Sequence, residues 1–262
     1  MSAVTTIRER LRLRRRDPEG RMTLVEHLEE LRSRLMVSLG AIAFGSAIGW
    51  FLYPRVLDLL LDPYCDYLRT VPENVRPSQG CGLFFLGALD PMMIKLKTVL
   101  FIGLFIALPA ILFQAWRFVV PGLTRSERRL GIPFVVSSVL LFALGATVAY
   151  VTLPKGLQFL LGFAGPQFAP LLTGDRFLGF VMMVALAFGL SFEFPVVLVF
   201  LQVLGIISSR QLRDWRRSAI LFVAVFAAVI TPSSDPYTML AMMVPMVAFY
   251  EGAIITGRLL KK

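Results

Sequence analysis

The chain has few residues that carry chemistry: one histidine, His27, and two cysteines, Cys65 and Cys81, among 262 residues. Protein metal sites normally take three or four Cys, His or carboxylate ligands, and no haem or iron–sulfur spacing occurs. We therefore expect no metal and no cofactor. The HExxH zinc pattern, the GxSxG nucleophile turn and a nucleotide-binding loop are also missing, so the sequence predicts a protein that is not an enzyme.

Acidic residues are scarce as well, since 17 Asp and Glu stand against 27 Lys and Arg, a net charge of +10. Hydrophobic residues make up 56% of the chain and the mean hydropathy is +0.72, more than a soluble domain normally carries. On a membrane protein, basic residues mark the cytoplasmic side and contact anionic lipids. No basic patch interleaved with aromatics occurs outside the N-terminal tail, so we expect no nucleic-acid partner.

Six apolar segments are candidates for membrane helices, which need about 20 residues. They are 35–53, 98–120, 130–153, 177–207, 218–230 and 237–255. The fifth has 13 residues, about 20 Å as a helix, so it either spans a thinned bilayer or forms half of a re-entrant hairpin with the sixth. The fold class predicted is an all-α polytopic membrane protein with six transmembrane helices.

Lys and Arg alternate from one connection to the next, which sets the orientation. Nine arginines precede residue 35, whereas the connection 54–90 has three basic and five acidic residues. This pattern places both termini in the cytoplasm. The predicted organisation is a disordered basic tail over 1–21 and a membrane domain over 22–262, with outer loops 54–97 and 154–176 and cytoplasmic loops 121–130 and 208–217.

The segment MTLVEHLEELRSR, residues 22–34, predicts an amphipathic helix that leads into the first span. Thr23 and Glu26 have the spacing of a capping box, and leucines recur at helical spacing along one face. Charged residues occupy the other faces. A solvated face with pairs such as Glu30–Arg34 is the alternative interpretation.

The segment QAWRFVVPGLTRSERRL, residues 114–130, is expected to leave the membrane, turn and re-enter. Trp116 and Phe118 lie where aromatic belts occur. Glu127 is the only acid in this basic loop, and a local pair with Arg128 or Arg129 is the alternative to a binding role.

Glu193 lies in the apolar run ALAFGLSFEFPVVLVF, two residues before Pro195. An acid inside a membrane segment indicates a functional site, so the alternative function for the whole chain is a proton-coupled secondary transporter with Glu193 as its proton site. Glu251 and Asp235 lie near opposite ends of the spans and form no continuous relay with it, which disfavours that alternative. A protonated, structural carboxyl is the other alternative.

The chain closely resembles the TatC family over about residues 22–256. Four motifs carry the resemblance, in this order: HLEELRSRL, QAWRFVVPGLTRSERR, SFEFP and TPSSDP. TatC is the multispanning core subunit of the twin-arginine protein translocase. The resemblance implies a glove-like concave bundle with short fifth and sixth helices. It also implies a receptor for the twin-arginine signal peptides of folded proteins, which are exported with the proton-motive force.

The resemblance also implies functional residues. Glu30 and Glu127 would bind the arginine pair by forked guanidinium–carboxylate contacts, with Arg32 as the supporting residue. Glu193 would be a polar point on the concave side. The further positions are Phe118, Pro121 and Leu123 for the signal-peptide surface, Pro63 and Lys97 for the outer loop, and Thr231, Asp235 and Met239 for docking of partner helices.

At position 239 many family members carry glutamine, so Met239 removes a polar contact from the docking surface. The implied partners are single-span TatA- and TatB-like subunits, signal peptides and further copies in a multimeric receptor complex, in a bacterial-type cytoplasmic membrane. The cysteines lie outside the family's motifs. An oxidising outer face would permit a Cys65–Cys81 disulfide, and two unpaired thiols are the alternative.

Overall fold

The computed structural model describes residues 24–71, 76, 80–119, 131–162, 172–231 and 235–259. In this part of the chain every regular element is a helix, and the only β-type pairing is an isolated bridge between Phe84 and Thr173. Five stretches are long and apolar enough to cross a membrane, so the all-α, multi-pass membrane class is confirmed. The helices are α2 (Leu24–Thr70), α3 (Asp90–Val119), α4 (Gly131–Gly162), α5 (Gly174–Ser191), α6 (Phe194–Val203), α7 (Ser209–Asp214), α8 (Arg216–Ile230) and α9 (Pro236–Leu259).

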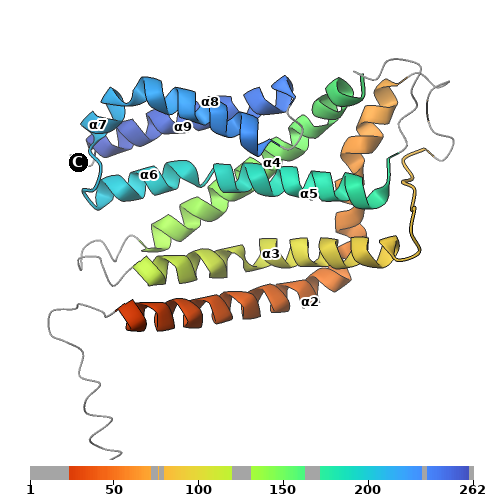
Figure 1. Cartoon of the computed structure of the whole chain (residues 1–262), viewed down its shortest axis with the longest axis horizontal. Coiled ribbons are helices and arrows are strands. Elements are labelled where there is room, and N and C mark those ends of the chain that lie inside the picture. The colour runs from red at the N-terminus through yellow and green to blue at the C-terminus, as the bar shows by residue number, and fades with distance from the viewer. Residues whose placement is uncertain are drawn as a thin grey trace, which may run out of the picture.

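In Figure 1 the N-terminal half of α2 and the helix α3 lie on one side of the molecule and α8 and α9 on the other, while the C-terminal half of α2 crosses from the first side to the second. The consecutive helices α5 and α6 run between these pairs, and α4 crosses the molecule obliquely. Contacts between elements agree with this view, because α4 touches α2, α3, α5, α6 and α9. The helix α4 therefore ties the two sides together.

The first helix is much longer than the predicted span 35–53, because α2 continues for 47 residues. The predicted outer loop 54–97 thus begins and ends in helix, and Pro63 is a buried helical residue instead of a loop residue. Charged residues after Tyr53 end the apolar run, but Leu60, Tyr64 and Leu68 recur at helical spacing and are buried in the core. That stripe stabilises the extension. α2 bends midway in Figure 1, and it contains Pro54 and Pro63, which cannot complete a helical hydrogen bond and are common causes of kinks.

Glycines set the spacing of the two most closely packed helices, α2 and α3. A β-carbon on Gly45 would lie 2.6 Å from the carbonyl oxygen of Gly103, so a side chain at either position would push the helices apart. Small residues allow membrane helices to approach in this way. The close approach fixes the antiparallel register of α2 against α3.

The predicted fourth span, 177–207, is two helices. α5 ends at Ser191 and α6 begins at Phe194, with Phe192 and Glu193 between them. Pro195 lies in the first turn of α6, where its missing N–H is tolerated, whereas in an unbroken helix it would clash with the preceding turn. Glu193 therefore lies at a helix break.

The C-terminal part also differs from prediction in two places. The predicted loop 208–217 contains the short helix α7, which a capping box of Ser208 and Gln211 begins. α8 has 15 residues, about 22 Å, and is short as predicted. α9 has 24 residues, about 36 Å, so the expected short sixth helix is wrong. The connection predicted as an outer loop over 154–176 is also shorter than expected, because α4 continues to Gly162 and α5 begins at Gly174.

Three links join the chain where α2 ends and where α3 and α5 begin. Cys65 and Cys81 form a disulfide with Cα atoms 5.2 Å apart, a separation typical of disulfides. Gly174 donates a backbone hydrogen bond of 2.9 Å to Phe84. Lys97 on α3 pairs with Asp175 on α5 at 2.6 Å, which gives the sequence-predicted Lys97 a partner.

We predict that the intact protein, isolated under oxidising conditions, is lighter than its reduced form by two hydrogen atoms in mass spectrometry. Reduction should lower its thermal unfolding midpoint in detergent, because a disulfide contributes about 2–4 kcal/mol by restricting the unfolded chain. The Cys65→Ser/Cys81→Ser variant should unfold at the lower temperature with or without reductant. Free thiols in the oxidised preparation would contradict the pairing.

Candidate functional site

A half-buried ion pair lies where α2 meets the C-terminal end of α3. Arg34 Nη2 donates to Glu30 Oε1 at 2.8 Å, and the two side chains are 22% and 17% exposed. Arg34 Nη1 donates to Gln114 Oε1 on α3 at 3.2 Å. The carboxylate thus lies at a helix–helix contact, which differs from the solvated face that the sequence left as an alternative.

Two polar atoms of this pair are buried and have no hydrogen-bond partner among the described residues, namely Glu30 Oε2 and Arg34 Nε. A buried, unpaired carboxylate oxygen carries a desolvation cost that an incoming donor would remove. Glu30 thus keeps one oxygen that a cationic donor could bind without breaking the Arg34 contact, once the groups that cover this oxygen move aside.

One turn nearer the N-terminus, the rings of His27 and Phe118 stack with centroids 4.3 Å apart. Phe118 follows Gln114 by one turn of α3, so the stack lies beside the Glu30–Arg34 pair. The sequence predicted Phe118 as part of the signal-peptide surface, and the structure places it next to Glu30. The stack gives that side of the carboxylate an aromatic wall.

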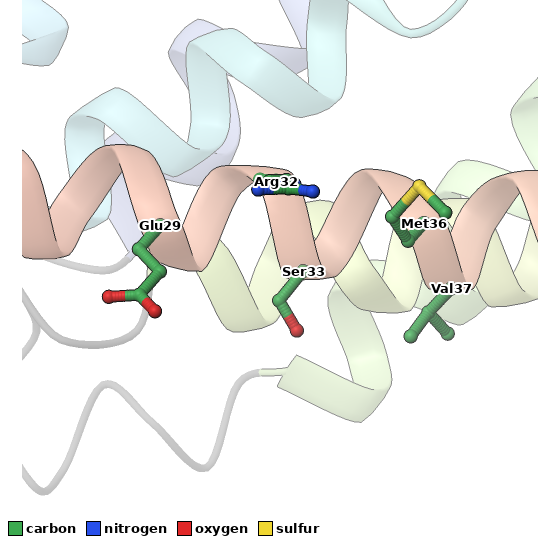
Figure 2. Close-up of a pocket in the computed structure, with 5 residues that line it drawn as sticks. All are labelled: Glu29, Arg32, Ser33, Met36 and Val37. Atoms are coloured by element: carbon green, nitrogen blue, oxygen red, sulfur yellow. The ribbon is translucent and has the colours of Figure 1, made fainter.

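Arg32, the residue expected to support Glu30, lies elsewhere. Figure 2 shows it with Glu29, Ser33, Met36 and Val37 along a hollow of about 500 Å³ on α2. Helical geometry explains the difference, because residues four apart share a face and residues two apart do not. Arg34 therefore holds Glu30, and a role of Arg32 at the signal peptide stays a prediction.

Trp116 also differs from expectation. It is 5% exposed and packs against Phe134 on α4 and Phe200 on α6, with ring centroids 5.0 and 5.4 Å away. Gly131 leaves room for the indole, since a β-carbon there would lie 2.8 Å from Trp116 Cδ1. Trp116 is thus a core residue and not part of a lipid-facing belt.

Glu193 is partly buried at the α5–α6 break. The hydroxyl of Ser138 on α4 lies near it, but neither Ser138 Oγ nor Glu193 Oε1 has a hydrogen-bond partner among the described residues. The other acids considered for a relay are engaged: Glu251 pairs with Arg216 at 2.7 Å, and Asp235 bonds Thr238. This arrangement gives no support to the transporter alternative.

The residues predicted to dock partner helices lie mostly inside the fold. Thr231 and Asp235 are 2% and 1% exposed. Asp235 accepts hydrogen bonds of 2.8 and 2.5 Å from the backbone N–H and the hydroxyl of Thr238, which caps the start of α9. Met239 packs partly buried against the main core. The docking role stays a prediction, and these contacts give Asp235 a structural role of its own.

A family model described as Sec-independent protein translocase protein (TatC) matches residues 26–245. The chain belongs to the TatC family. It is 45% identical over 242 residues to the Sec-independent protein translocase protein TatC of Frankia casuarinae, a match that covers 91% of this chain and 66% of that relative. The TatC of Aquifex aeolicus is 39% identical over 241 residues, which cover 91% of this chain and 95% of that one.

A solved structure gives the same result for the fold. The crystal structure of the twin arginine translocase receptor TatC superposes with a TM-score of 0.71 at 38% sequence identity. The match covers 90% of this chain and all of the other. The TatC fold is therefore shared over nearly the whole described chain.

Within this TatC chain, the predicted signal-peptide residues Pro121, Leu123 and Glu127 lie outside the described residues. Of the predicted set, the structure brings together Glu30 and Phe118. The structure also brings Arg34 and Gln114 together at this site, and the sequence does not predict the contact between these two residues. The available signal was Gln114 itself, an amide within the apolar segment 98–120, where a polar side chain needs a partner.

We predict that Asp235→Ala destabilises the isolated TatC chain, because the substitution removes the carboxylate that accepts two buried hydrogen bonds from Thr238. The expected loss is about 1–3 kcal/mol, visible as a lower thermal unfolding midpoint in detergent without partner subunits. Asp175→Ala is the matched control, since its exposed pair with Lys97 is worth at most about 1 kcal/mol. Equal midpoints for Asp235→Ala and wild type would contradict the capping role.

Proposed function

We propose that this chain is the receptor subunit of a twin-arginine translocase, which binds the twin-arginine signal peptides of folded proteins. The observation that carries the proposal is the free, buried Oε2 of Glu30 in a chain whose family match covers residues 26–245. A guanidinium is a forked donor that suits such an oxygen. Glu30 and Glu127 together bind the two arginines, and Phe118, Pro121 and Leu123 shape the surface around them.

The surrounding charges support recognition by geometry. The net charge of the chain is +10, so a generic cationic peptide gains little from long-range attraction. An arginine gains affinity only where its fork meets a carboxylate at short range. The receptor thereby rejects peptides that are merely basic.

We place the chain in a bacterial-type cytoplasmic membrane with six spans and both termini in the cytoplasm. Five stretches are long enough to cross unaided, and the 15-residue α8 crosses where the bilayer thins around it. In this orientation the Cys65–Cys81 disulfide lies on the oxidising outer face. Basic residues at the cytoplasmic ends contact anionic lipids.

Export requires partners beyond this chain. Small single-span subunits of the TatA and TatB type dock near α8 and α9, further copies of the chain assemble beside it, and the proton-motive force supplies the energy. The exposed apolar residues of α8, such as Leu221, Val225 and Val229, offer lipid or partner helices a continuous surface.

Glu193 faces the translocation path at the α5–α6 break, where water or a polar partner group solvates it.

The proposal predicts that Glu30→Gln weakens binding of a twin-arginine signal peptide roughly ten- to hundredfold, the value of one lost charge-assisted hydrogen bond. Binding of a fluorescent synthetic signal peptide to the chain in nanodiscs measures this. Glutamine keeps the size of the side chain and still accepts from Arg34, so the fold should survive.

Glu29→Gln is the matched control, because Glu29 is the preceding residue and faces the hollow of Figure 2 instead of Gln114. It removes the same charge and should leave the affinity within about twofold of wild type, as expected for a screened surface charge. Equal losses for both variants would show that bulk charge, and not the Glu30 site, governs binding.

The orientation predicts that a cysteine placed at Ser234, in a background without Cys65 and Cys81, reacts with a membrane-impermeant maleimide only from the outer side. The reason is that α8 crosses the bilayer and returns through α9. Reaction from the cytoplasmic side of inverted vesicles would show instead that α8 and α9 form a re-entrant hairpin.

A further inference from the structure

The contact between Arg34 and Glu30 uses less of the arginine than it could. A guanidinium carries five N–H donors in a rigid fork and can pair both oxygens of a carboxylate. Here one nitrogen, Nη2, bonds one oxygen, Oε1, at 2.8 Å. Nε and Oε2, the two atoms that a second parallel bond would join, are both buried and unpartnered among the described residues.

Gln114 accounts for this incomplete pairing. Its Oε1 accepts from Arg34 Nη1 at 3.2 Å across the helix interface. The hydrogen bond anchors the fork to α3 at the nitrogen that does not contact Glu30. Rotation of the guanidinium onto both carboxylate oxygens would have to break or stretch that anchor.

We propose that Gln114 is a positioning residue that keeps Arg34 on one oxygen of Glu30 and leaves Oε2 unpaired, so that an arginine of the signal peptide can pair with it when the peptide displaces the groups that cover it. This inference rests on the proposed function. Gln114 does not contact the peptide. Arg34 competes with the peptide arginine for the carboxylate of Glu30, and the hydrogen bond from Arg34 to Gln114 restrains that competition. Removing the amide lets Arg34 close over both oxygens and occupy the site.

The arrangement also favours arginine over lysine. A guanidinium can bond Oε2 through one arm and keep further N–H groups for neighbouring acceptors. An ammonium is a compact, strongly hydrated charge that loses more hydration on entering a half-buried site. The unpaired Oε2 of Glu30 lies beside the guanidinium of Arg34, which occupies Oε1. The planar guanidinium of a peptide arginine fits this place better than the ammonium of a lysine, because two planar groups can stack closely.

Three variants test the proposal: Gln114→Leu, Arg34→Met, and the two combined. The probe is a fluorescent synthetic signal peptide with an arginine pair, and a lysine-pair version is the comparison, both titrated on the full chain in nanodiscs. We expect Gln114→Leu to weaken the arginine peptide roughly tenfold, about one charge-assisted hydrogen bond. Arg34→Met alone should bind at least as well as wild type, and the double variant should recover to within about threefold of wild type.

The thermal unfolding midpoint, rather than recovery in the double variant, separates this mechanism from a merely structural role of Gln114, because replacing Arg34 also removes the guanidinium that Gln114→Leu leaves without its partner. The proposal predicts that Gln114→Leu loses affinity for the arginine peptide while its unfolding midpoint in detergent stays close to that of wild type, whereas a merely structural role predicts a midpoint that falls together with the affinity. Wild-type affinity for Gln114→Leu, or a double variant as weak as the single one, would overturn the proposal. So would a loss of binding in Arg34→Met, which would make Arg34 a direct contact. If Glu30→Gln also binds like wild type, the proposed function itself fails; if only Glu30→Gln loses affinity, the function stands and the role of Gln114 falls.

Discussion

The close packing of α2 against α3 at Gly45 and Gly103 is the contact on which the candidate site depends. A β-carbon at Gly45 would meet the backbone of α3 at 2.6 Å, so the two helices touch through their main chains and cannot slide freely. The same antiparallel register brings Arg34 to Gln114, about three helical turns away along both helices. A larger side chain at Gly45 or Gly103 would push the two helices apart and thereby change the Arg34–Gln114 contact at the candidate site.

Burial distinguishes the Glu30–Arg34 pair from an ordinary surface ion pair. An exposed i,i+4 pair is worth about 0.3–0.5 kcal/mol, whereas the Glu30–Arg34 pair is mostly covered and keeps one carboxylate oxygen unpaired. Burying that oxygen without a partner costs free energy. In the proposed function an arginine of the signal peptide removes this cost, so the binding free energy becomes more favourable. Because the net charge of the chain is +10, a peptide that is merely basic is not attracted from a distance, so in the proposed function short-range pairing with Glu30 decides its affinity.

Apolar length and charge patterning were sufficient to predict the membrane class, and ordered motifs were sufficient for the family. They failed where a tertiary contact decides the structure. Charges after Tyr53 end the apolar run, yet Tyr64 and Leu68 are buried against other helices and extend α2 to Thr70. The family motif favours Arg32 as the support of Glu30, whereas helical spacing indicates a Glu30–Arg34 pair, and the structure has the Glu30–Arg34 pair. Gln114 could be noticed as a polar residue among apolar ones, but its partner depends on the α2–α3 register, which no local pattern contains.

Photocrosslinking from position 118 tests the central claim most directly. A photoreactive phenylalanine analogue there replaces the ring that stacks on His27 with centroids 4.3 Å apart, and His27 lies one helical turn before Glu30 on α2. Our account predicts a crosslink to a twin-arginine signal peptide at or beside its arginine pair, suppressed by excess unlabelled peptide and weak for a lysine-pair peptide. Equal crosslinking of both peptides, or a crosslink that maps far from the arginine pair, would contradict the assignment of this site to arginine recognition.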